Sequence, residues 1–372
     1  MESIKKYAWY FPNWHPTPLN DRWHGKNWTE WECVKCARPR FEGHEQPKVP
    51  LWGYEDESDP AVFAKKIDTA HKYGIDGFIF DFYWFKEEGP YRRDCLEKGF
   101  LGAPNNELCE FSVMWCNHDP IYAHPAAYLH KGNELASGFI DEPFFIEVTD
   151  YCIRHYFPKP NYQRVNGKLF FGFWLMDRLI NDLGGLENTA RVLNDFRKRA
   201  AAAGFELHLA TQKSKFPGYK QRDKETVLNT AKTIGLDSFF TYGWNSPKPE
   251  VWPVVPFKDF REKAMKDMRE ESAFSPIPLN FTVSLGWDSS PRTTQSDMYE
   301  DVGYPYNAII TGNTPEEIEK AFAGTKALID EGICTGDFLT VSTWNEWTEG
   351  NYLEPDTKYG YAYLEAMKKV FG

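Results

Sequence analysis

Short runs of apolar and β-branched residues alternate with longer amphipathic stretches along almost the whole chain. The short runs have the composition of strands buried on both faces, and the longer stretches carry apolar residues at helical spacing. Strands are predicted at residues 7–11, 77–83, 111–116, 169–174, 206–211, 238–243, 279–285 and 338–343. Helices are predicted at residues 60–73, 91–101, 143–156, 186–203, 224–234, 259–271, 315–331 and 359–370, with the weakest pattern at 91–101. This alternation is typical of an α/β fold of the (β/α)8 TIM-barrel type.

Local signals support several of these helices. Asp59 precedes Pro60 in the order of an N-cap and a first helical position, and Gly74 follows the end of the same helix. Thr314 and Pro315 begin another helix in the same way. A doubly wound open sheet is the main alternative, but no GxGxxG or GxxxxGK[ST] turn follows the first strand. No repeat or Pro/Gly-rich linker divides the chain, so residues 1–372 are predicted to form one domain.

Two connections between a predicted strand and its helix are long, at residues 13–59 and 117–142. In a barrel both lie at the C-terminal ends of the strands, where active sites are found. Connections of this length are uncommon unless they are functional or disordered. Their aromatic and imidazole side chains, too many for a disordered segment, include Trp14, His15, Trp23, His24, Trp28, Trp31 and Tyr122. We therefore expect these loops to form the walls of a cleft.

Composition narrows the possible ligands. Hydrophobic residues make up 42% of the chain and charged residues 26%, which is ordinary for a globular protein. The formal net charge of -11 argues against nucleic acid or an anionic membrane surface as a partner. No apolar run approaches the length of a membrane span. The aromatic content of 17%, with 14 Trp, is high, and aromatic rings suit stacking on the apolar faces of sugars.

The cysteines and the N-terminus carry little functional signal. Seven Cys are scattered along the chain, which does not fit a disulfide framework. Cys33 and Cys36 form one CxxC pair, but no second CxxC or HxxxH supplies further zinc ligands, so two reduced thiols are favoured over a metal site. No cofactor is expected. The first residues lack the apolar region of a signal peptide, which fits a cytoplasmic protein or a mature chain whose signal has been removed.

If the barrel is correct, the residues just after each strand converge on one site. In strand order they are Tyr10, Asn13, His15; Asp81, Tyr83, Trp84; Trp115, Asn117, His118, Asp119; Trp174, Asp177; Gln212, Lys213; Tyr242, Trp244, Asn245; Trp287, Asp288, Arg292; and Asn345, Glu346, Glu349. Any one of them is more often a packing or loop-capping residue. Their joint placement, with aromatic, amide and carboxylate groups at nearly every strand end, favours a polyhydroxylated ligand.

Two of these positions have competing interpretations. Asp81 lies in an otherwise apolar strand, where a buried acid must be paired, hydrogen-bonded or exposed to a cleft, so structural and functional roles are equally supported. His118 and Asp119 could form an acid–base pair, although a single loop histidine is more often a surface residue.

The stretch from Trp344 to Gly350, with sequence WNEWTEG, follows the last predicted strand and holds two carboxylates beside two tryptophans. No GxSxG or HExxH motif is present, and paired carboxylates with aromatic walls indicate glycosidic bond chemistry. In a straight strand, residues three apart face opposite sides. Glu346 and Glu349 can therefore share a cleft only if the chain turns between them, and Gly350 makes such a turn plausible.

The same stretch, followed by Leu353-Glu354-Pro355, resembles the WNEWxEG…EP signature of the WbsX-like family, which is related to glycoside hydrolase family 99, the endo-α-mannosidases and endo-α-mannanases. Further segments over essentially the whole chain match blocks of that family. They are Tyr10-Phe11-Pro12-Asn13-Trp14-His15, Thr29-Glu30-Trp31, Gly43-His44-Glu45-Gln46-Pro47, Tyr83-Trp84-Phe85 and Trp287-Asp288-Ser289-Ser290-Pro291-Arg292.

The resemblance implies a (β/α)8 barrel and a retaining glycosidase without a metal. By position, Glu346 would be the base on the substrate's own 2-hydroxyl, forming a 1,2-anhydro sugar, and Glu349 the general acid and then base. Such assistance requires an α-manno or α-rhamno configuration, so the expected partner is a glycan or polysaccharide. Substrate-binding roles are predicted for Tyr10, His15, Trp31, Asp81, Tyr83, Trp84, Trp115, Asn117, Tyr242, Trp244, Trp287, Asp288, Arg292 and Asn345.

The sequence departs from the family pattern at two of these places. Position 13 is Asn where the family usually has Gln, and position 81 is acidic where the family is generally neutral and aromatic. Both departures concern the choice of sugar. Two alternatives to a hydrolase stay open: a glycosyltransferase of polysaccharide biosynthesis, although no nucleotide-sugar motif is apparent, and a non-catalytic glycan-binding barrel.

Overall fold

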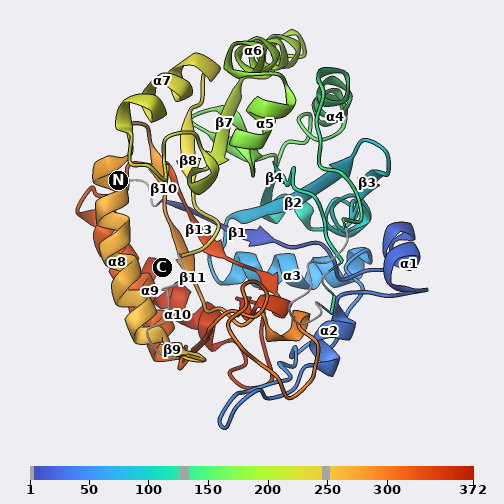
Figure 1. Ribbon diagram of the computed structural model, residues 1–372, viewed down its shortest axis with the longest axis vertical. Helices are drawn as coiled ribbons and strands as arrows, with labels where there is room; N and C mark the ends of the chain where they lie inside the picture. Colours follow the sequence, from blue (N-terminus) through green and yellow to red (C-terminus); the bar gives the residue numbers. More distant parts are fainter. Residues whose placement is uncertain (1–3, 123, 126–133, 245–251) are drawn as a thin grey trace.

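The computed structural model describes residues 4–122, 124–125, 134–244 and 252–372, and its central element is a parallel sheet curved into a barrel (Figure 1). Asn245 lies outside these residues. The sheet order is β10-β8-β7-β6-β4-β2-β1-β13-β11. The strands are β1 (Lys5–Tyr10), β2 (Gly77–Phe85), β4 (Glu110–Trp115), β6 (Lys168–Phe173), β7 (Leu207–Gln212), β8 (Ser238–Phe240), β10 (Leu279–Asn280), β11 (Thr282–Ser284) and β13 (Phe338–Ser342). All eight predicted strands are confirmed.

The seventh predicted strand closes the barrel. Its first part, β10, pairs in parallel with β8, and its second part, β11, pairs in parallel with β13. Only Phe281 separates the two parts, so one continuous segment has a neighbour on each side. A closed sheet has no free edge, which is the arrangement of a (β/α)8 barrel.

Helices surround the strands (Figure 1). Seven predicted helices are confirmed: α3 (Pro60–Lys72), α4 (Glu142–His155), α6 (Leu186–Ala202), α7 (Lys224–Ile234), α8 (Phe257–Phe274), α9 (Pro315–Asp330) and α10 (Ala362–Phe371). The predicted caps form, since the Asp59 carboxylate accepts a hydrogen bond from the Ala61 amide and the Thr314 hydroxyl from the Glu317 amide. The weak pattern at 91–101 shortens to a single π-helical stretch, η1 (Cys95–Phe100).

The long first connection is folded rather than extended. It contains α1 (Pro18–His24) and α2 (Trp31–Cys36), which the pattern did not predict because both are shorter than two turns of amphipathic spacing. Trp14 and Trp31 pack with ring centroids 4.0 Å apart, and both rings are buried. A further short helix, α5 (Met176–Asp182), follows β6. Two short strand pairs outside the barrel order also form. Strand β9 (Val254–Pro256) pairs with β12 (Ile309–Thr311), and β3 (Gly89–Tyr91) pairs with the end of β2.

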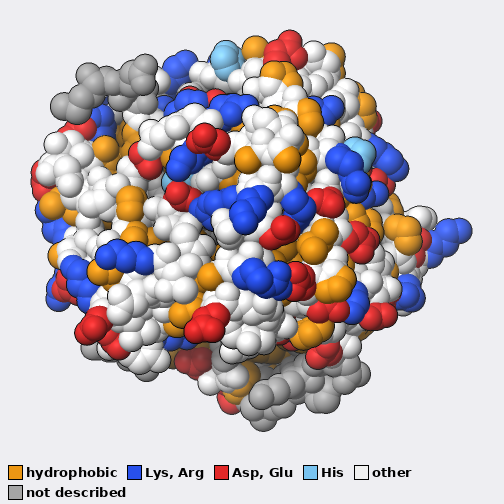
Figure 2. Space-filling model, turned by 90° about the horizontal axis from the view of Figure 1, so that it is seen from above, with side chains coloured by type: hydrophobic (Ala, Val, Ile, Leu, Met, Phe, Trp, Pro, Cys, Tyr) orange, Lys and Arg blue, Asp and Glu red, His pale blue; other side chains and the backbone are white. Residues whose placement is uncertain are grey.

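The core has two apolar layers because side chains alternate along each strand. Trp9, Ile79 and Phe240 point into the barrel, whereas Phe80 and Phe171 point out toward the helices. Acidic and basic side chains lie side by side over the face seen in Figure 2. None of the helices in the described parts of the chain combines the length and apolarity that crossing a membrane requires.

Candidate active site at the end of the eighth strand

The WNEWTEG stretch forms a tight hairpin just after β13. Strand β14 (Asn345–Glu346) pairs in antiparallel fashion with β15 (Asn351–Tyr352), and the 3-10 turn η5 (Trp347–Glu349) joins them. The chain therefore reverses between the two glutamates. This reversal removes the difficulty of their three-residue spacing and lets both carboxylates face one cavity.

Gly350 is required at the end of this turn. Its φ of +59° lies in the left-handed region, and a Cβ there would lie 2.7 Å from Cβ of Asp288. The Asp288 amide donates to the Glu349 carbonyl at 2.5 Å, so the segment after β11 lies directly against the turn. Any other residue at 350 would push the two segments apart and displace Glu349.

Glu346 and Glu349 line a cavity of about 430 Å³ at the C-terminal end of the barrel. Its other lining residues are Phe11, Asp81, Tyr83, Met114, Cys116, His118, Trp174, Gln212, Tyr242, Gly243, Trp244, Phe260, Ser284, Gly286, Trp287, Arg292, Tyr304, Ser342 and Asn351. Aromatic rings and polar groups alternate around the wall, which is the lining expected for a sugar ring.

Arg292 connects the two glutamates. Its Nη2 donates to Oε1 of Glu346 at 2.6 Å, and its Nη1 donates to Oε1 of Glu349 at 2.5 Å. Its Nε donates to Oε1 of Glu30 at 2.8 Å. The Tyr304 hydroxyl lies 3.0 Å from the same Glu349 oxygen. One buried guanidinium thus serves three buried carboxylates, with side-chain exposures of 7% for Arg292 and 0%, 3% and 11% for its partners.

One guanidinium cannot neutralise three carboxylates, so the pKa values of Glu30, Glu346 and Glu349 differ. Burial would raise the pKa of Glu30, but Arg292 holds it well below its ordinary value. Burial raises the pKa of Glu346 well above its ordinary value and also raises that of Glu349, with Arg292 opposing both shifts. Repulsion between Glu346 and Glu349 adds to the shift of Glu346. Titratable neighbours whose pKa values are pushed apart are typical of acid–base chemistry.

Asp81 is a third acid on the cavity wall, and no cation of the described residues is bonded to it. Burial raises its pKa to about 8, although the hydrogen bond with Tyr242 opposes the shift. The Tyr242 hydroxyl lies 3.1 Å from Oδ2, and Oδ1 has no partner among the described residues. Near neutral pH Asp81 is therefore largely uncharged, and its Oδ1 is left as a hydrogen-bonding atom for a ligand in the cavity.

Six of the predicted substrate-binding residues line this cavity together with the two glutamates. They are Asp81, Tyr83, Tyr242, Trp244, Trp287 and Arg292. His118 and Trp174, which the strand-end argument also named, line it as well. They come from strands far apart in the sequence, and the barrel brings them together.

Three predicted residues lie on the wrong face of their strands for this cavity. Successive side chains along a strand point to opposite faces of the sheet, and Tyr10, Trp84 and Trp115 occupy positions that face the helices. All three belong to the outer apolar layer. Trp115, for example, packs on Phe145 of α4 with ring centroids 5.9 Å apart.

Four more predicted residues make contacts within the loops themselves. The Asn117 amide is hydrogen-bonded with the backbone of Leu175, and the Asn345 amide with the backbone of Phe11. His15 and Trp31 are buried within the first connection. None of these side chains reaches the cavity.

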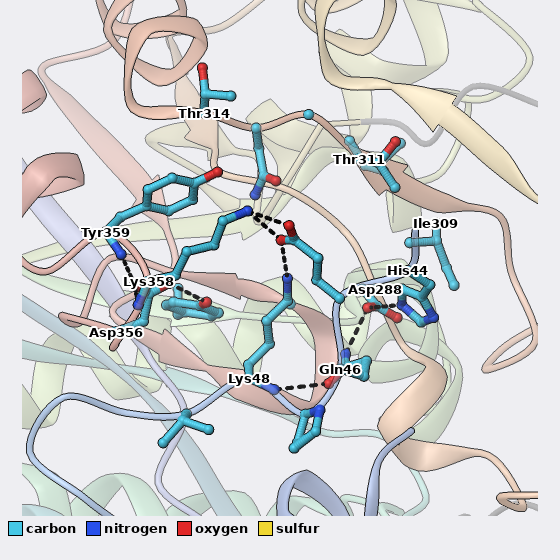
Figure 3. Close-up of a pocket in the computed structure, with 18 of the residues that line it drawn as sticks. His44, Gln46, Lys48, Asp288, Ile309, Thr311, Thr314, Asp356, Lys358 and Tyr359 are labelled. Carbon is cyan, nitrogen blue, oxygen red and sulfur yellow. Dashed lines mark hydrogen bonds and ion pairs between the residues drawn. The ribbon is translucent and has the colours of Figure 1, made fainter. Parts of the chain in front are cut away.

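Asp288 lies behind the cavity, in the wall of a second pocket of about 550 Å³. His44 and Gln46 point at its carboxylate from the first connection, at 2.8 and 2.7 Å (Figure 3). Burial opposes ionisation, but the His44 hydrogen bond lowers the pKa of Asp288 to about 2. Asp288 thus ties the first connection to the segment that supports Gly350, and it does not line the cavity that contains Glu346.

Several residues of the cavity and of the Arg292 ion pairs were not singled out from the sequence. Met114 and Cys116 follow from the alternation of β4 once the in-facing register is known. Glu30 was visible only as part of a TEW motif, and Tyr304 lies in a loop with no periodic signal. No group of three His, Cys, Asp or Glu side chains suited to a metal occurs among the described residues. Cys33 and Cys36 are free thiols.

Known proteins show similarity on two levels. In sequence, residues 6–367 match the profile of a family described as glycosyltransferase WbsX. An uncharacterized protein, WxcX, of Xanthomonas campestris pv. campestris is 27% identical over 381 residues, which cover 98% of this chain and 49% of that protein. The chain spans about half the length of the curated relatives it matches.

In structure, the chain resembles the glycoside hydrolase family 99 endo-α-mannosidase of Bacteroides thetaiotaomicron, with a TM-score of 0.59, 13% identity and coverage of 97% and 95% of the two chains. A glycoside hydrolase-like protein gives a TM-score of 0.61 at 14% identity, with coverage of 100% and 94%. At these identities the likeness shows a shared barrel fold. The family profile extends over nearly the whole chain, and the chain therefore belongs to the WbsX family.

Proposed function

We propose that this chain is a glycoside hydrolase that cleaves α-linked, manno-configured glycans (mannose- or rhamnose-like) with retention, and that residues 1–372 form its one catalytic domain. The observation that carries the proposal is the bonding of Glu346 and Glu349 to adjacent nitrogens of one guanidinium inside an aromatic cavity. Two carboxylates held this close favour the short separation of retaining enzymes over the wider gap that inverting enzymes need for a water.

The two glutamates take different roles in the proposed reaction, as the family resemblance implies. Glu346 removes the proton of the substrate 2-hydroxyl, and that oxygen attacks C1 to form a 1,2-anhydro sugar. Glu349 donates a proton to the leaving oxygen as the C1–O bond breaks. Water then opens the three-membered ring at C1, losing a proton to Glu349, while O2 regains its proton from Glu346. The raised pKa of Glu349 fits its role as the acid. The pKa of Glu346 is raised as well, so Glu346 acts as the base only when it is ionised.

The charge of the cavity supports a neutral glycan as substrate. Among the described lining residues Arg292 is the only Lys or Arg, and its donors are taken by three carboxylates. A nucleotide-sugar donor brings a diphosphate, which proteins bind with free cations, a metal or a glycine-rich turn. A glycosyltransferase is the second candidate, and the description of the matched family favours it.

Separate Glu346→Gln and Glu349→Gln variants test the proposal. Each should lose at least about a thousandfold in kcat on a 1,2-trans α-glycoside, because each removes a group that acts only in the transition state. Glu32→Gln, an exposed acid of α2, is the matched control and should keep wild-type activity. NMR of the first-formed anomer should show retention, and product release from α-mannans and rhamnose-containing polysaccharides identifies the sugar.

Each alternative predicts a different outcome. A glycosyltransferase would be stabilised thermally by a nucleotide sugar and not by the glycan alone. A non-catalytic binding barrel would bind glycan equally well with either glutamine variant and release no product. Full activity in either variant would overturn the assignment of Glu346 and Glu349.

A further inference from the structure

A second cluster of buried charges lies on the far side of the catalytic hairpin from the cavity. Lys66 of α3 is 1% exposed, and its ammonium group is 2.5 Å from Oε1 of Glu57 and also bonded to Oε1 of Glu354. The side chains of the two acids are 0% and 2% exposed. None of the three residues lines the cavity that contains Glu346. We refer to Lys66, Glu57 and Glu354 as the Lys66 cluster.

Both chain neighbours of Glu346 are bonded to this cluster. The Asn345 amide nitrogen lies 3.2 Å from each oxygen of Glu57. The Trp347 indole nitrogen donates to Oε2 of Glu354 at 2.8 Å. Asn345 and Trp347 flank Glu346, and their side chains reach Glu57 and Glu354, whereas the side chain of Glu346 lines the cavity. The Lys66 cluster therefore grips the hairpin from behind while Glu346 faces the cavity.

Both oxygens of Glu354 already have a partner, and losing one of these bonds would cost free energy. Oε1 of Glu354 is taken by Lys66 and Oε2 by Trp347, so turning the indole away would leave a buried carboxylate oxygen unpaired. Such a loss is costly among side chains that are almost fully buried. The positions of residues 345 and 347 fix the backbone of residue 346 and the direction of its Cα–Cβ bond. Asn345 is also tied to both backbone groups of Phe11 at 2.9 Å, which anchors the hairpin to β1.

We propose that Lys66, Glu57 and Glu354 are positioning residues that aim the Glu346 carboxylate at the substrate, an inference that rests on the proposed hydrolase function. They touch neither substrate nor reacting atoms. They act through Asn345 and Trp347, and they hold the base in place while Arg292 sets its charge on the other side. Buried ionic clusters add little to stability compared with apolar packing, so directional bonding is the better physical reason for this one.

Trp347→Phe is the first test, because it keeps an aromatic ring and deletes the donor to Glu354. The matched control is Trp344→Phe, since Trp344 is equally buried in the same motif and its indole nitrogen has no partner among the described residues. Misplacing a catalytic group by a fraction of an ångström should lower kcat about tenfold to a hundredfold, with KM within about twofold. The control should change neither by more than about threefold. Equal effects of the two substitutions would overturn the proposal.

The leaving group of the substrate can show whether a substitution impairs Glu346 or Glu349. An aryl glycoside with an acidic leaving group needs little help from a general acid, so a defect in Glu349 spares it, whereas a defect in Glu346 does not. Trp347→Phe should therefore lose kcat equally on the aryl glycoside and on the natural linkage. A loss confined to the natural linkage would place the defect on Glu349 and contradict the proposal.

Lys66→Met gives an independent test, with Lys65→Met as its control on the neighbouring helix position. Lys65 is 38% exposed and pairs with Glu55 rather than with the hairpin. Hydrogen exchange of the amides at residues 345–352 should speed up at least about tenfold in Lys66→Met and in Glu354→Gln but not in Lys65→Met. Glu354→Gln keeps the side-chain shape and serves if Lys66→Met does not fold.

The two proposals can fail separately. If the wild-type chain releases no product from any α-glycoside while exchange at 345–352 responds as expected, the hydrolase function fails and the bracing of the hairpin stands. If the wild type is active but exchange and kcat do not respond to Trp347→Phe and Glu354→Gln, the positioning role fails and the hydrolase function stands.

Discussion

Two buried cations lie on opposite sides of one hairpin and differ in what surrounds them. Arg292 faces three carboxylates, and two of them, Glu346 and Glu349, line an open cavity. Lys66 faces two carboxylates in a sealed region behind the hairpin. Both clusters hold more acid than base, and both contain a glutamate whose pKa is raised by burial: Glu346 in the first and Glu57, to about 7, in the second.

The comparison shows that a carboxylate with a raised pKa is not for that reason alone a catalytic group. Burial raises the pKa of Glu57 as it raises that of Glu346. The oxygens of Glu57 are nevertheless bonded to Lys66 and Asn345, and Glu57 does not line the cavity that contains Glu346. The distinguishing feature is access to a cavity that a substrate can enter. A sealed cluster can hold a segment in place, and an open one can exchange protons with a ligand.

Arg292→Met should produce the largest effect that separates the two clusters. We expect about a thousandfold loss of kcat/KM, because three carboxylates lose their common cation and repel one another. The pKa of Glu346, already raised by burial, should rise further without the opposing charge. Since the base must be ionised, the acidic limb of the pH–rate profile should move to higher pH. An unmoved limb would show that Arg292 does not set the charge of Glu346.

Lys66→Met should affect stability more than any exposed cation does. Removing one partner of a sealed cluster leaves buried carboxylates unpaired and should lower the free energy of unfolding by about 3 kcal/mol. The neighbouring Lys65→Met removes a partly exposed pair and should change it by less than about 0.5 kcal/mol. Urea unfolding measures both values. Similar losses in the two variants would mean that the cluster is not sealed.

Asp81→Asn tests the acid that neither cation serves. The folded-state pKa of about 8 is above the unfolded value, so the folded state binds the extra proton and its contribution to stability is lost as pH rises toward 8. The neutral amide escapes this loss. The variant should therefore gain about 4 kcal/mol of unfolding free energy relative to wild type between about pH 5 and about pH 9, at about 1.4 kcal/mol for each pH unit below 8. A difference that does not vary with pH would contradict the raised pKa.

Tyr304→Phe should give the smallest effect. The ring is about half exposed, but its hydroxyl reaches both Arg292 and Glu349. Losing these two hydrogen bonds should lower kcat/KM about threefold to tenfold on a natural linkage and less on an aryl glycoside with a good leaving group. Equal losses on both substrates would show that Tyr304 does not act through the acid.

The architecture was predictable because the spacing of apolar residues along each segment indicates whether that segment is a strand or a helix. All eight strands and seven of the eight helices follow from apolar spacing and from caps such as Asp59 and Thr314. The exception at 91–101 forms only the short η1, where neighbouring Phe63 and Glu57 pack so closely on Gly99 that a Cβ would meet them within 2.5 Å. Tertiary packing decides such segments, and periodicity does not report it.

The candidate site was predictable only in part. Being at a strand end places a residue near the correct face of the barrel, and this much located Asp81, Tyr83, Trp287 and Arg292. It does not say whether the side chain points inward, and Trp84 and Trp115 point outward because the pleat alternates. In strands as apolar on both faces as β2, the sequence contains no signal that separates the two registers.

The sequence alone determined the barrel, the aromatic character of its loops and the motif that holds Glu346 and Glu349, because each depends on contacts within a few residues or on a recognisable pattern. The tertiary structure alone decided what those glutamates touch. Arg292, Glu30 and Lys66 reach the hairpin from positions between 54 and 316 residues away from Glu346. Contacts closed over such distances depend on where the whole barrel places its loops, and no local pattern encodes them.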